Sequence, residues 1–370
     1  MIPLSVPDLR GREAEYLSVC VADNWVSSAG PYVVQFERAI AELSERKFAV
    51  ATVNGTAALH LALIAGGIKP GDLVAVPDWS FAASVNAILH AGATPLFIDI
   101  EPSSWTIDTA LLAQAFEEYG SKLRAVLAVD VLGVIANFPA ISELAAKHGA
   151  VVVEDAAGAI GAKLNGRPAG VFGDAACFSF NGNKTLTAGG GGMLVTDNEA
   201  LARYARHLST QARVGADYIH DAAGFNYRMT NLNAAVGVAQ FERLNDMLTA
   251  KRAISLRYAD ALRQRNDIAL PPLPADRESS HWLASVVMHN EAAARSLVAH
   301  MAKNGVECRI FWRSLSAQAP YAKFPRKLNG TAADISGRVV NLPCSSNLTA
   351  DEQSRVIGAL SAWVHNDRIE

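Results

Sequence analysis

Short apolar runs alternate with amphipathic stretches over the first half of the chain. Apolar runs bounded by polar or turn residues predict strands at 48–53, 72–77, 95–100, 124–130, 150–155, 175–180 and 192–197. Between them, apolar positions at helical spacing predict helices over 56–65, 81–91, 108–118 and 138–148. This alternation is typical of an α/β fold whose sheet is largely parallel and covered by helices on its faces.

The pattern changes after residue 198. It predicts a polar helix over 199–213, a turn-rich segment around Gly224, and one long helix from Asn231 through Tyr258. A proline-rich stretch follows at 271–280, and then a second, weaker α/β pattern has apolar runs at 282–288, 306–312 and 339–343. We therefore expect a large domain over residues 1–250 and a smaller C-terminal α/β domain over residues 251–370.

Composition narrows the possible classes of protein. The chain has 370 residues, of which 50% are hydrophobic, so it can bury a sizeable core. Lys plus Arg number 33 and Asp plus Glu number 36, a formal charge of -3 that argues against a partner such as nucleic acid or a membrane surface. Any anionic ligand must then be held by a local site.

Cysteine spacing predicts neither a zinc site nor a disulfide framework, and hydropathy predicts no membrane span. The four cysteines have neither zinc-type spacing nor the density of a disulfide framework: Cys20, Cys177, Cys308 and Cys344. The start of the chain lacks the basic and apolar regions of a signal peptide, and no later run reaches the ~18 apolar residues that a membrane span needs. We expect a soluble, cytoplasmic protein.

The first candidate site lies where an apolar strand meets V-N-G-T-A-A-L at residues 53–59. Gly55 would let a ligand approach the backbone, and the amides of Thr56 and Ala57 would be free at a helix N-terminus, which favours an anion. An ordinary helix cap formed by Asn54 or Thr56 is the alternative.

The second candidate site closes the strand V-V-V-E-D with two acids. Since side chains alternate along a strand, Glu154 and Asp155 should point to opposite sides, so that one of them faces the ligand. A carboxylate there could keep a heteroaromatic nitrogen protonated, whereas capping of the next helix is the alternative.

The third and most informative stretch runs from Cys177 to Met193 and contains Lys184 in a polar loop flanked by glycines. Partial burial lowers the pKa of a lysine and frees its nucleophilic neutral form, so Lys184 is a candidate reactive amine. Ser179 and Asn181 add polar donors, and the glycines at 189–192 permit close backbone approach. A solvated surface lysine is the alternative.

A fourth strand end, P-D-W-S-F at residues 77–81, carries Trp79 and Phe81. Their rings are predicted to reach the same edge of the sheet, where one could stack on a planar cofactor. Packing in the core is the competing explanation.

Several motifs, in order and at their spacing, resemble the DegT/DnrJ/EryC1/StrS family of sugar aminotransferases. The resemblance covers nearly the whole chain, through I-P-L-S-V-P, W-V-S-S-A-G-P-Y, N-G-T-A-A-L-H-L-A-L, E-D-A-A-G-A-I-G-A, S-F-N-G-N-K and G-F-N-Y-R-M-T-N-L-N-A-A-V-G-V-A-Q. It implies the fold-type I aminotransferase architecture, pyridoxal 5'-phosphate as cofactor and a homodimer with shared active sites.

The resemblance also implies roles for individual residues. Lys184 would be the Schiff-base lysine, Asp155 would pair with the pyridinium nitrogen, and Phe81 would stack on the cofactor ring. The phosphate would be received by Gly55, Thr56, Ala57, Ser179 and Asn181, and by Asn226 contributed from the partner subunit.

Within the family, S-F-N-G-N-K followed by G-G-G-G-M most resembles the enzymes that act on UDP-linked 4-keto-6-deoxy-N-acetylhexosamines, on routes to bacillosamine and legionaminic acid. Such an enzyme would take an amino group from L-glutamate and place it on the C4 carbonyl of the sugar, for surface-glycan biosynthesis. The same resemblance points to five residues near the sugar or the neighbouring subunit, for each of which loop packing is the alternative: Trp25, Ser27, Ser28, His220 and Tyr227. Arg309 and Trp312 are expected on the small-domain side of the cleft.

Two positions depart from the family pattern. Gly158 stands where relatives commonly carry Gln or Glu, so a contact near the cofactor hydroxyl is missing or supplied elsewhere. Asp130, in D-V-L-G, stands where relatives read H-L-Y-G or H-V-L-G, so a carboxylate replaces an imidazole near the cleft.

Three other functions compete with an aminotransferase. A dehydratase of the same family typically replaces the Schiff-base lysine with histidine, whereas this chain has Lys184. A pyridoxal-phosphate-binding regulator would need a DNA-binding appendage or basic segment, which the sequence does not show. The glycine run at 189–192 does not form the G-x-G-x-x-G of a dinucleotide-binding fold.

Overall fold

The computed structural model describes residues 1–364 and has a mostly parallel eight-stranded sheet at its centre. Only β9 runs antiparallel to its neighbours within this sheet. In spatial order its strands are β1 (Phe48–Thr52), β9 (Gly192–Thr196), β8 (Ala175–Ser179), β5 (Val151–Asp155), β4 (Leu123–Val129), β2 (Leu73–Pro77), β3 (Thr94–Ile98) and β16 (Arg326–Lys327). The predicted strands are confirmed to within two residues at each end.

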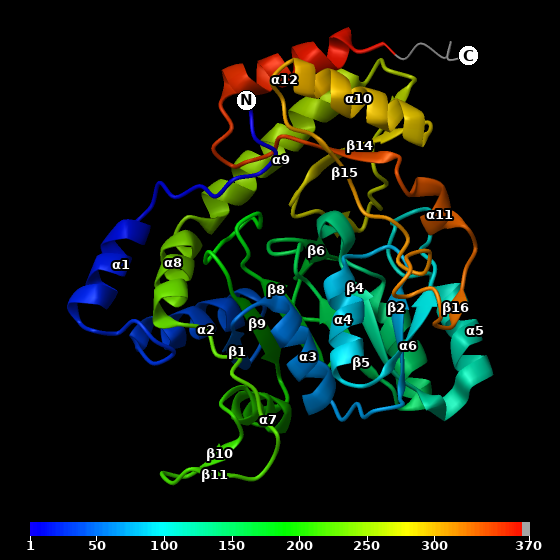
Figure 1. Cartoon of the computed structure of the whole chain (residues 1–370). Coiled ribbons are helices and arrows are strands. Elements are labelled where there is room, and N and C mark those ends of the chain that lie inside the picture. The colour runs from blue at the N-terminus through cyan, green and yellow to red at the C-terminus, as the bar shows by residue number, and fades with distance from the viewer. Residues whose placement is uncertain (365–370) are drawn as a thin grey trace.

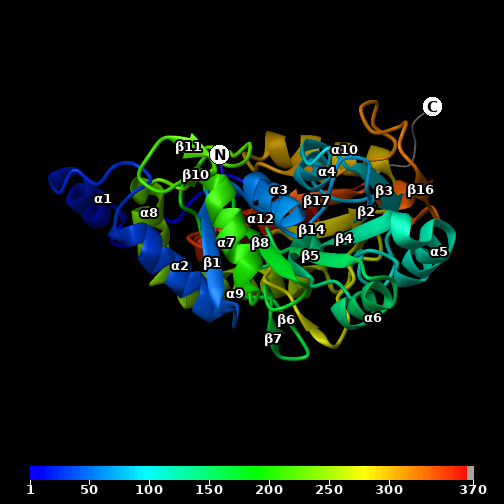
Figure 2. The same ribbon diagram turned by 90° about the horizontal axis from the view of Figure 1, so that it is seen from below.

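Helices cover both faces of this sheet, as Figures 1 and 2 show. One apolar cluster joins the strands to α3 (Gly55–Ala65), α4 (Ala82–His90) and α7 (Glu199–Ser209). A second cluster joins the opposite face to α2 (Pro31–Leu43), α5 (Thr109–Tyr119) and α6 (Phe138–His148). The α/β class and the four predicted crossover helices are therefore confirmed.

The C-terminal part of the chain builds a second, smaller α/β unit. Its sheet has the order β12 (Ile268–Ala269), β14 (Ala284–Met288), β17 (Val339–Leu342) and β15 (Arg309–Ile310). A third apolar cluster packs this sheet against α9 (Leu244–Leu262), α10 (Glu291–Lys303) and α12 (Ala350–Ala362). Helix α9 passes through residue 250 without a break. The division into domains at residue 250 stays a prediction.

The remaining elements are short or lie at the periphery: α1 (Glu13–Ala22), two 3-10 turns (Gly120–Lys122 and Val131–Gly133), β6 (Lys163–Leu164), β7 (Arg167–Pro168), β10 (Arg213–Val214), β11 (Ile219–His220), α8 (Asn231–Phe241), β13 (Arg277–Glu278) and α11 (Thr331–Ile335).

Two predicted helices end earlier than expected. The helix predicted over 199–213 stops at Ser209, and the chain then forms the β10–β11 hairpin, which projects from the body of the molecule in Figure 1. The single helix predicted from Asn231 is wrong, because it breaks between Phe241 and Leu244 into α8 and α9. No glycine or proline marks this break in the sequence.

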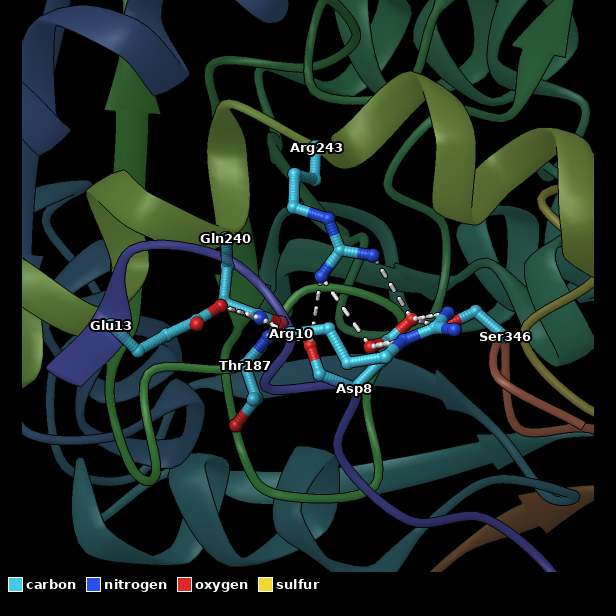
Figure 3. Close-up of polar contacts among 7 residues, drawn as sticks. All are labelled: Asp8, Arg10, Glu13, Thr187, Gln240, Arg243 and Ser346. Atoms are coloured by element: carbon cyan, nitrogen blue, oxygen red, sulfur yellow. Dashed lines mark hydrogen bonds and ion pairs between the residues drawn. The ribbon is translucent and has the colours of Figure 1, made fainter.

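A buried carboxylate lies beside the break (Figure 3). Asp8 accepts hydrogen bonds from the guanidinium groups of Arg10, at 2.7 Å, and Arg243, at 3.2 Å, and from the hydroxyl of Ser346. Gln240 donates to the backbone oxygen of Asp8 and to Glu13. The hydrogen bond with Arg10 holds the pKa of Asp8 well below its usual range. Residue 243 is thus held by a tertiary contact that helical spacing cannot reveal.

Two aspartates at strand ends fasten the C-terminal segment to the large sheet. Asp99, after β3, is buried and accepts the backbone N–H groups of Asn329, Gly330 and Ala332 at 2.8–2.9 Å. Asp78, after β2, accepts hydrogen bonds from the backbone N–H of Ser316, at 2.7 Å, and from the hydroxyl of Ser314. These bonds bring residues of the smaller unit to the carboxyl edge of the large sheet. Within residues 1–364, no helix combines the length and hydropathy needed to cross a membrane.

Asp99→Ala should lower the free energy of unfolding by about 3 kcal/mol or more, because buried backbone donors would lose a charged acceptor. Asp99→Asn keeps one acceptor oxygen and should lose less. Thermal unfolding of wild type and both variants gives the comparison. Equal melting temperatures for Asp99→Ala and wild type would show that this carboxylate does not hold the segment.

Candidate active site

A cleft of about 730 Å³ opens at the carboxyl edge of the large sheet, where the small unit meets it. Ligands of open α/β sheets gather at this edge, because the loops there leave each strand at its carboxyl end. The cleft is lined by residues from both units, including Lys184 and Asp155 from the large sheet and Trp282 from the small unit. The site residues predicted from the sequence can therefore be compared with the residues that line this cleft.

Lys184 lies in the loop that follows β8, and its backbone N–H donates to the oxygen of Asn181 at 2.9 Å. The residue keeps partial solvent exposure, yet its amine lies in the cleft among protein atoms. Desolvation lowers the pKa of Lys184 to about 8, while the negative charge of Asp155 acts in the opposite direction. A fraction of the amine is therefore neutral and nucleophilic near neutral pH.

Asp155 ends β5 and is buried in the floor of the cleft. It accepts the hydroxyl of Ser84 at 2.7 Å and the backbone N–H of Ala157 at 3.2 Å, so it both faces the cleft and caps the following turn. Burial raises the pKa of Asp155, and the hydrogen bond from Ser84 and the charge of Lys184 oppose this. A cationic ring nitrogen beside it would favour the ionised form further.

The second acid of this pair points the other way, as strand alternation predicts. Glu154 lies on the far side of β5, where its oxygens accept the N–H groups of Gly170 at 2.8 Å and Phe172 at 3.0 Å. Burial raises the pKa of Glu154 to about 7.

The N-terminus of α3 and the end of β8 form one end of the cleft. Gly55, Thr56, Ser179 and Asn181 all line it. A Cβ on Gly55 would lie 2.9 Å from the Cβ of Ser179, so glycine lets the helix approach the strand this closely. Backbone amides of a helix N-terminus and a serine hydroxyl together suit a phosphate.

Ala57 does not take part as expected. Its N–H donates to the side chain of Asn54 at 2.8 Å, so this amide is engaged in an ordinary helix cap, and Ala57 is outside the cleft lining. The prediction of a free amide at Ala57 is therefore corrected.

The two aromatic residues after β2 lie in different environments. Phe81 is 61% exposed and lines the cleft. Trp79 is fully buried, donates from Nε1 to the backbone oxygen of Trp312 at 2.9 Å and packs 5.2 Å from Trp105. The expectation that both rings reach the same edge is wrong for Trp79, which belongs to the core.

Arg309 and Trp312 line the cleft from the small unit. Six other predicted site residues do not line the cleft of their own chain: Trp25, Ser27, Ser28, His220, Asn226 and Tyr227. His220 lies on the projecting hairpin and Asn226 is exposed, whereas the hydroxyl of Tyr227 lies 3.3 Å from Nδ1 of His60.

Two residues of the site were not found from the sequence. Ser84 is placed beside Asp155 by the packing of α4, and Trp282 lies with its ring centroid 3.6 Å from Nζ of Lys184. Position 84 could have been suspected, since it follows the P-D-W-S-F strand end on a predicted helix. Trp282 comes from a segment almost 100 residues away along the chain, and no local pattern indicates its position.

Asp130 follows β4 and lines the cleft with its carboxyl buried. One oxygen accepts the N–H of Ala136 at 3.0 Å, and the carboxyl lies beside that of Glu154. Burial and the nearby charge of Glu154 hold the pKa of Asp130 well above its usual value. The carboxyl of Asp130 is thus favoured in its neutral form.

Comparison with known proteins decides the family. Residues 7–361 match the model of the DegT/DnrJ/EryC1/StrS aminotransferase family. The chain belongs to this family. It is therefore a transaminase, and its cofactor is pyridoxal 5'-phosphate.

Named relatives are similar along nearly the whole chain. The putative pyridoxal phosphate-dependent aminotransferase EpsN of Bacillus subtilis is 38% identical, covering 100% of this chain and 97% of its own. GDP-perosamine synthase of Vibrio cholerae is 37% identical, covering 98% and 99%. The crystal structure of a DegT DnrJ EryC1 StrS aminotransferase from Brucella abortus superposes with a TM-score of 0.88 at 29% identity, covering 95% and 94%. The aminotransferase architecture expected from the sequence is confirmed.

The donor set of the cleft fits the cofactor of this family. The cleft presents an amine on Lys184, a buried carboxylate on Asp155, and a helix N-terminus beside the hydroxyl of Ser179. These three groups match an aldehyde, a ring nitrogen and a phosphate in turn. The role of each residue remains a prediction.

Asp130→Asn should raise the melting temperature by a few degrees at pH 8, about 1–3 kcal/mol, because it removes a carboxyl that ionises freely in the unfolded chain but is disfavoured as a charge when buried. The pKa of Asp130 is higher in the folded than in the unfolded protein, so its ionisation destabilises the fold as pH rises above the unfolded value of about 4.

The gain should therefore shrink when the same melting curves are recorded at pH 5. Asn keeps the acceptor for the N–H of Ala136, so this hydrogen bond is not lost in the variant. A variant less stable than wild type at pH 8 would contradict a neutral Asp130.

Proposed function

We propose that this aminotransferase moves an amino group from L-glutamate to the C4 keto carbon of a UDP-linked 4-keto-6-deoxy-N-acetylhexosamine. The product is a 4-amino sugar for surface-glycan biosynthesis, and the keto oxygen leaves as water. The observation that carries the chemistry is the Lys184 amine held in one cleft with the Asp155 carboxylate. The sugar and its nucleotide rest on the motif resemblance around S-F-N-G-N-K.

The residues of the cleft have different proposed roles, which follow from the chemistry of their side chains. Pyridoxal phosphate, when bound, supplies an electron-withdrawing ring conjugated to the carbon that carries the amine. The amine of Lys184 would hold the cofactor through Nζ and, when free, could accept or donate a proton beside the reacting carbon. Asp155 would favour the protonated form of the ring nitrogen, and Ser84 orients the Asp155 carboxylate through its 2.7 Å hydrogen bond.

The remaining cleft residues bind and orient. Gly55, Thr56, Ser179 and Asn181 line one end of the cleft and would receive the phosphate, and Phe81, which also lines the cleft, would stack on the ring. Burial between the two units excludes water from the amine, which keeps its pKa near the working pH.

The active site is proposed to be completed by a second copy of the chain. Exposed residues with predicted ligand roles lie outside their own cleft, among them Asn226 and His220, and the hairpin that carries His220 projects from the body in Figure 1. In a homodimer these residues, with Trp25, Ser27, Ser28 and Tyr227, would reach the partner's cleft.

A GDP-linked sugar is the second candidate substrate, favoured by the 37% identity to GDP-perosamine synthase over nearly the whole chain. A dehydratase or a regulator without activity is less well supported, since Lys184 is present with a lowered pKa in the cleft.

Purified protein with pyridoxal phosphate should show a visible absorption band that L-glutamate replaces with the band of pyridoxamine phosphate. The second half-reaction is then run with UDP- and GDP-linked 4-keto-6-deoxy sugars, and the amino sugar is identified by mass spectrometry. Lys184→Arg keeps the charge but should lose turnover entirely. Full turnover in Lys184→Arg would overturn the mechanism, whereas turnover with the GDP sugar alone would overturn only the nucleotide assignment.

Asp155→Asn should lower kcat by about 100-fold or more, because a neutral amide cannot favour the protonated ring nitrogen. Cofactor binding, measured by the change of tryptophan fluorescence, should weaken less than kcat falls. Ser84→Ala is the matched variant: it removes one hydrogen bond to the carboxylate and should cost less than Asp155→Asn. Unchanged kcat in Asp155→Asn would remove this role from Asp155.

A further inference from the structure

The indole of Trp282 lies against the amine of Lys184. Nζ is 3.6 Å from the centroid of the indole ring, and Trp282 is only 5% exposed. A cation over an aromatic face within about 6 Å is attracted to it, most strongly when the pair is desolvated. The contact therefore gives the free lysine amine one preferred position in the cleft.

Hydrogen bonds fix the orientation of this indole. Nε1 of Trp282 donates to the backbone oxygen of Asn183 at 2.9 Å, next to the reactive lysine. The buried ammonium of Lys251 donates to the backbone oxygen of Trp282 at 3.0 Å. Ser280, two residues earlier, donates from Oγ to the oxygen of Gly158 at 2.7 Å. The ring is thus held from the lysine loop, from α9 and from the turn after β5.

Two glycines make room for this segment. A Cβ on Gly158 would lie 2.5 Å from Cε3 of Trp282, and a Cβ on Gly133 would lie 2.0 Å from Oγ of Ser280. Both distances are shorter than non-bonded atoms can approach, so any side chain at either position would displace the segment 280–282. The departure at Gly158, where relatives commonly carry Gln or Glu, thereby acquires a physical reason in this chain.

We propose that Trp282 is a positioning residue for Lys184. Its indole face receives the lysine amine whenever that amine is not bonded to the cofactor. Position 158 is glycine because the indole fills the space that a side chain there would occupy. The inference rests on the transamination proposed above, in which the amine is alternately bonded and free. The charged groups that share the cleft with the amine are Asp130, Asp155, Glu307, Arg309 and Arg313.

The test measures the pKa of Lys184 in the full-length protein after removal of the cofactor. Limited acetylation with acetic anhydride is followed across pH by mass spectrometry of the Lys184 peptide, with exposed Lys147 as internal reference. Trp282→Phe keeps an aromatic face, whereas Trp282→Leu keeps only an apolar one. The pKa of Lys184 should be lower in Trp282→Leu than in Trp282→Phe by about half a unit or more, because the cation loses its aromatic partner.

The role of Gly158 is tested with the same labelling. Gly158→Ala should push the indole aside and lower the pKa of Lys184 as Trp282→Leu does, and the double variant should equal Trp282→Leu alone. Gly182→Ala is the matched control, since it lies on the lysine loop and a Cβ there would meet no atom within 4 Å. It should leave the pKa unchanged.

The same pKa of Lys184 in Trp282→Leu and Trp282→Phe would overturn the proposal, and so would additive effects of Gly158→Ala and Trp282→Leu. If Trp282→Leu does not fold, as judged by circular dichroism, Gly158→Ala against Gly182→Ala decides. The labelling needs neither cofactor nor sugar, so failure of the proposed function would appear in the absorption and turnover measurements instead.

Discussion

The parallel sheet places four buried aspartates at one edge, and the geometry of the cleft depends on which groups surround each carboxyl. Asp99, Asp78, Asp130 and Asp155 follow or end four neighbouring strands, β3, β2, β4 and β5. A buried carboxylate is costly unless donors or an opposite charge surround it. Each aspartate has a different set of partners, and two of these sets hold residues of the C-terminal segment at this edge, where the cleft opens.

Asp99 and Asp78 are satisfied by backbone N–H groups of residues 316–332, which fastens the small unit to the large sheet. Asp155 accepts a hydrogen bond from Ser84 and lies near the amine of Lys184, whose charge opposes the effect of burial on the pKa of Asp155. Asp130 lies beside Glu154 and has a raised pKa. The edge therefore combines two carboxylates that fasten the small unit with one that lies near Lys184 in the cleft and one that favours the neutral form.

The amine of Lys184 shows how the two units act together. Its pKa falls because the amine is desolvated, and residues of both units line the cleft that holds it. The small unit also contributes Trp282, whose ring lies on the amine and is admitted by Gly158. The glycine at position 158 is thus linked to a residue more than 120 positions away along the chain.

The sequence by itself determined the sheet, its crossover helices and the residues at the strand ends, because periodicity and strand alternation are local properties. It also singled out Lys184, Asp155, Phe81, Ser179 and Thr56, all of which line one cleft. Only the tertiary structure decided the break before Leu244, the core position of Trp79, the engagement of the Ala57 amide and the contact of Trp282 with Lys184. These features depend on partners distant in sequence, such as Asp8 at Arg243 and Trp282 at Gly158, and no local pattern records such contacts.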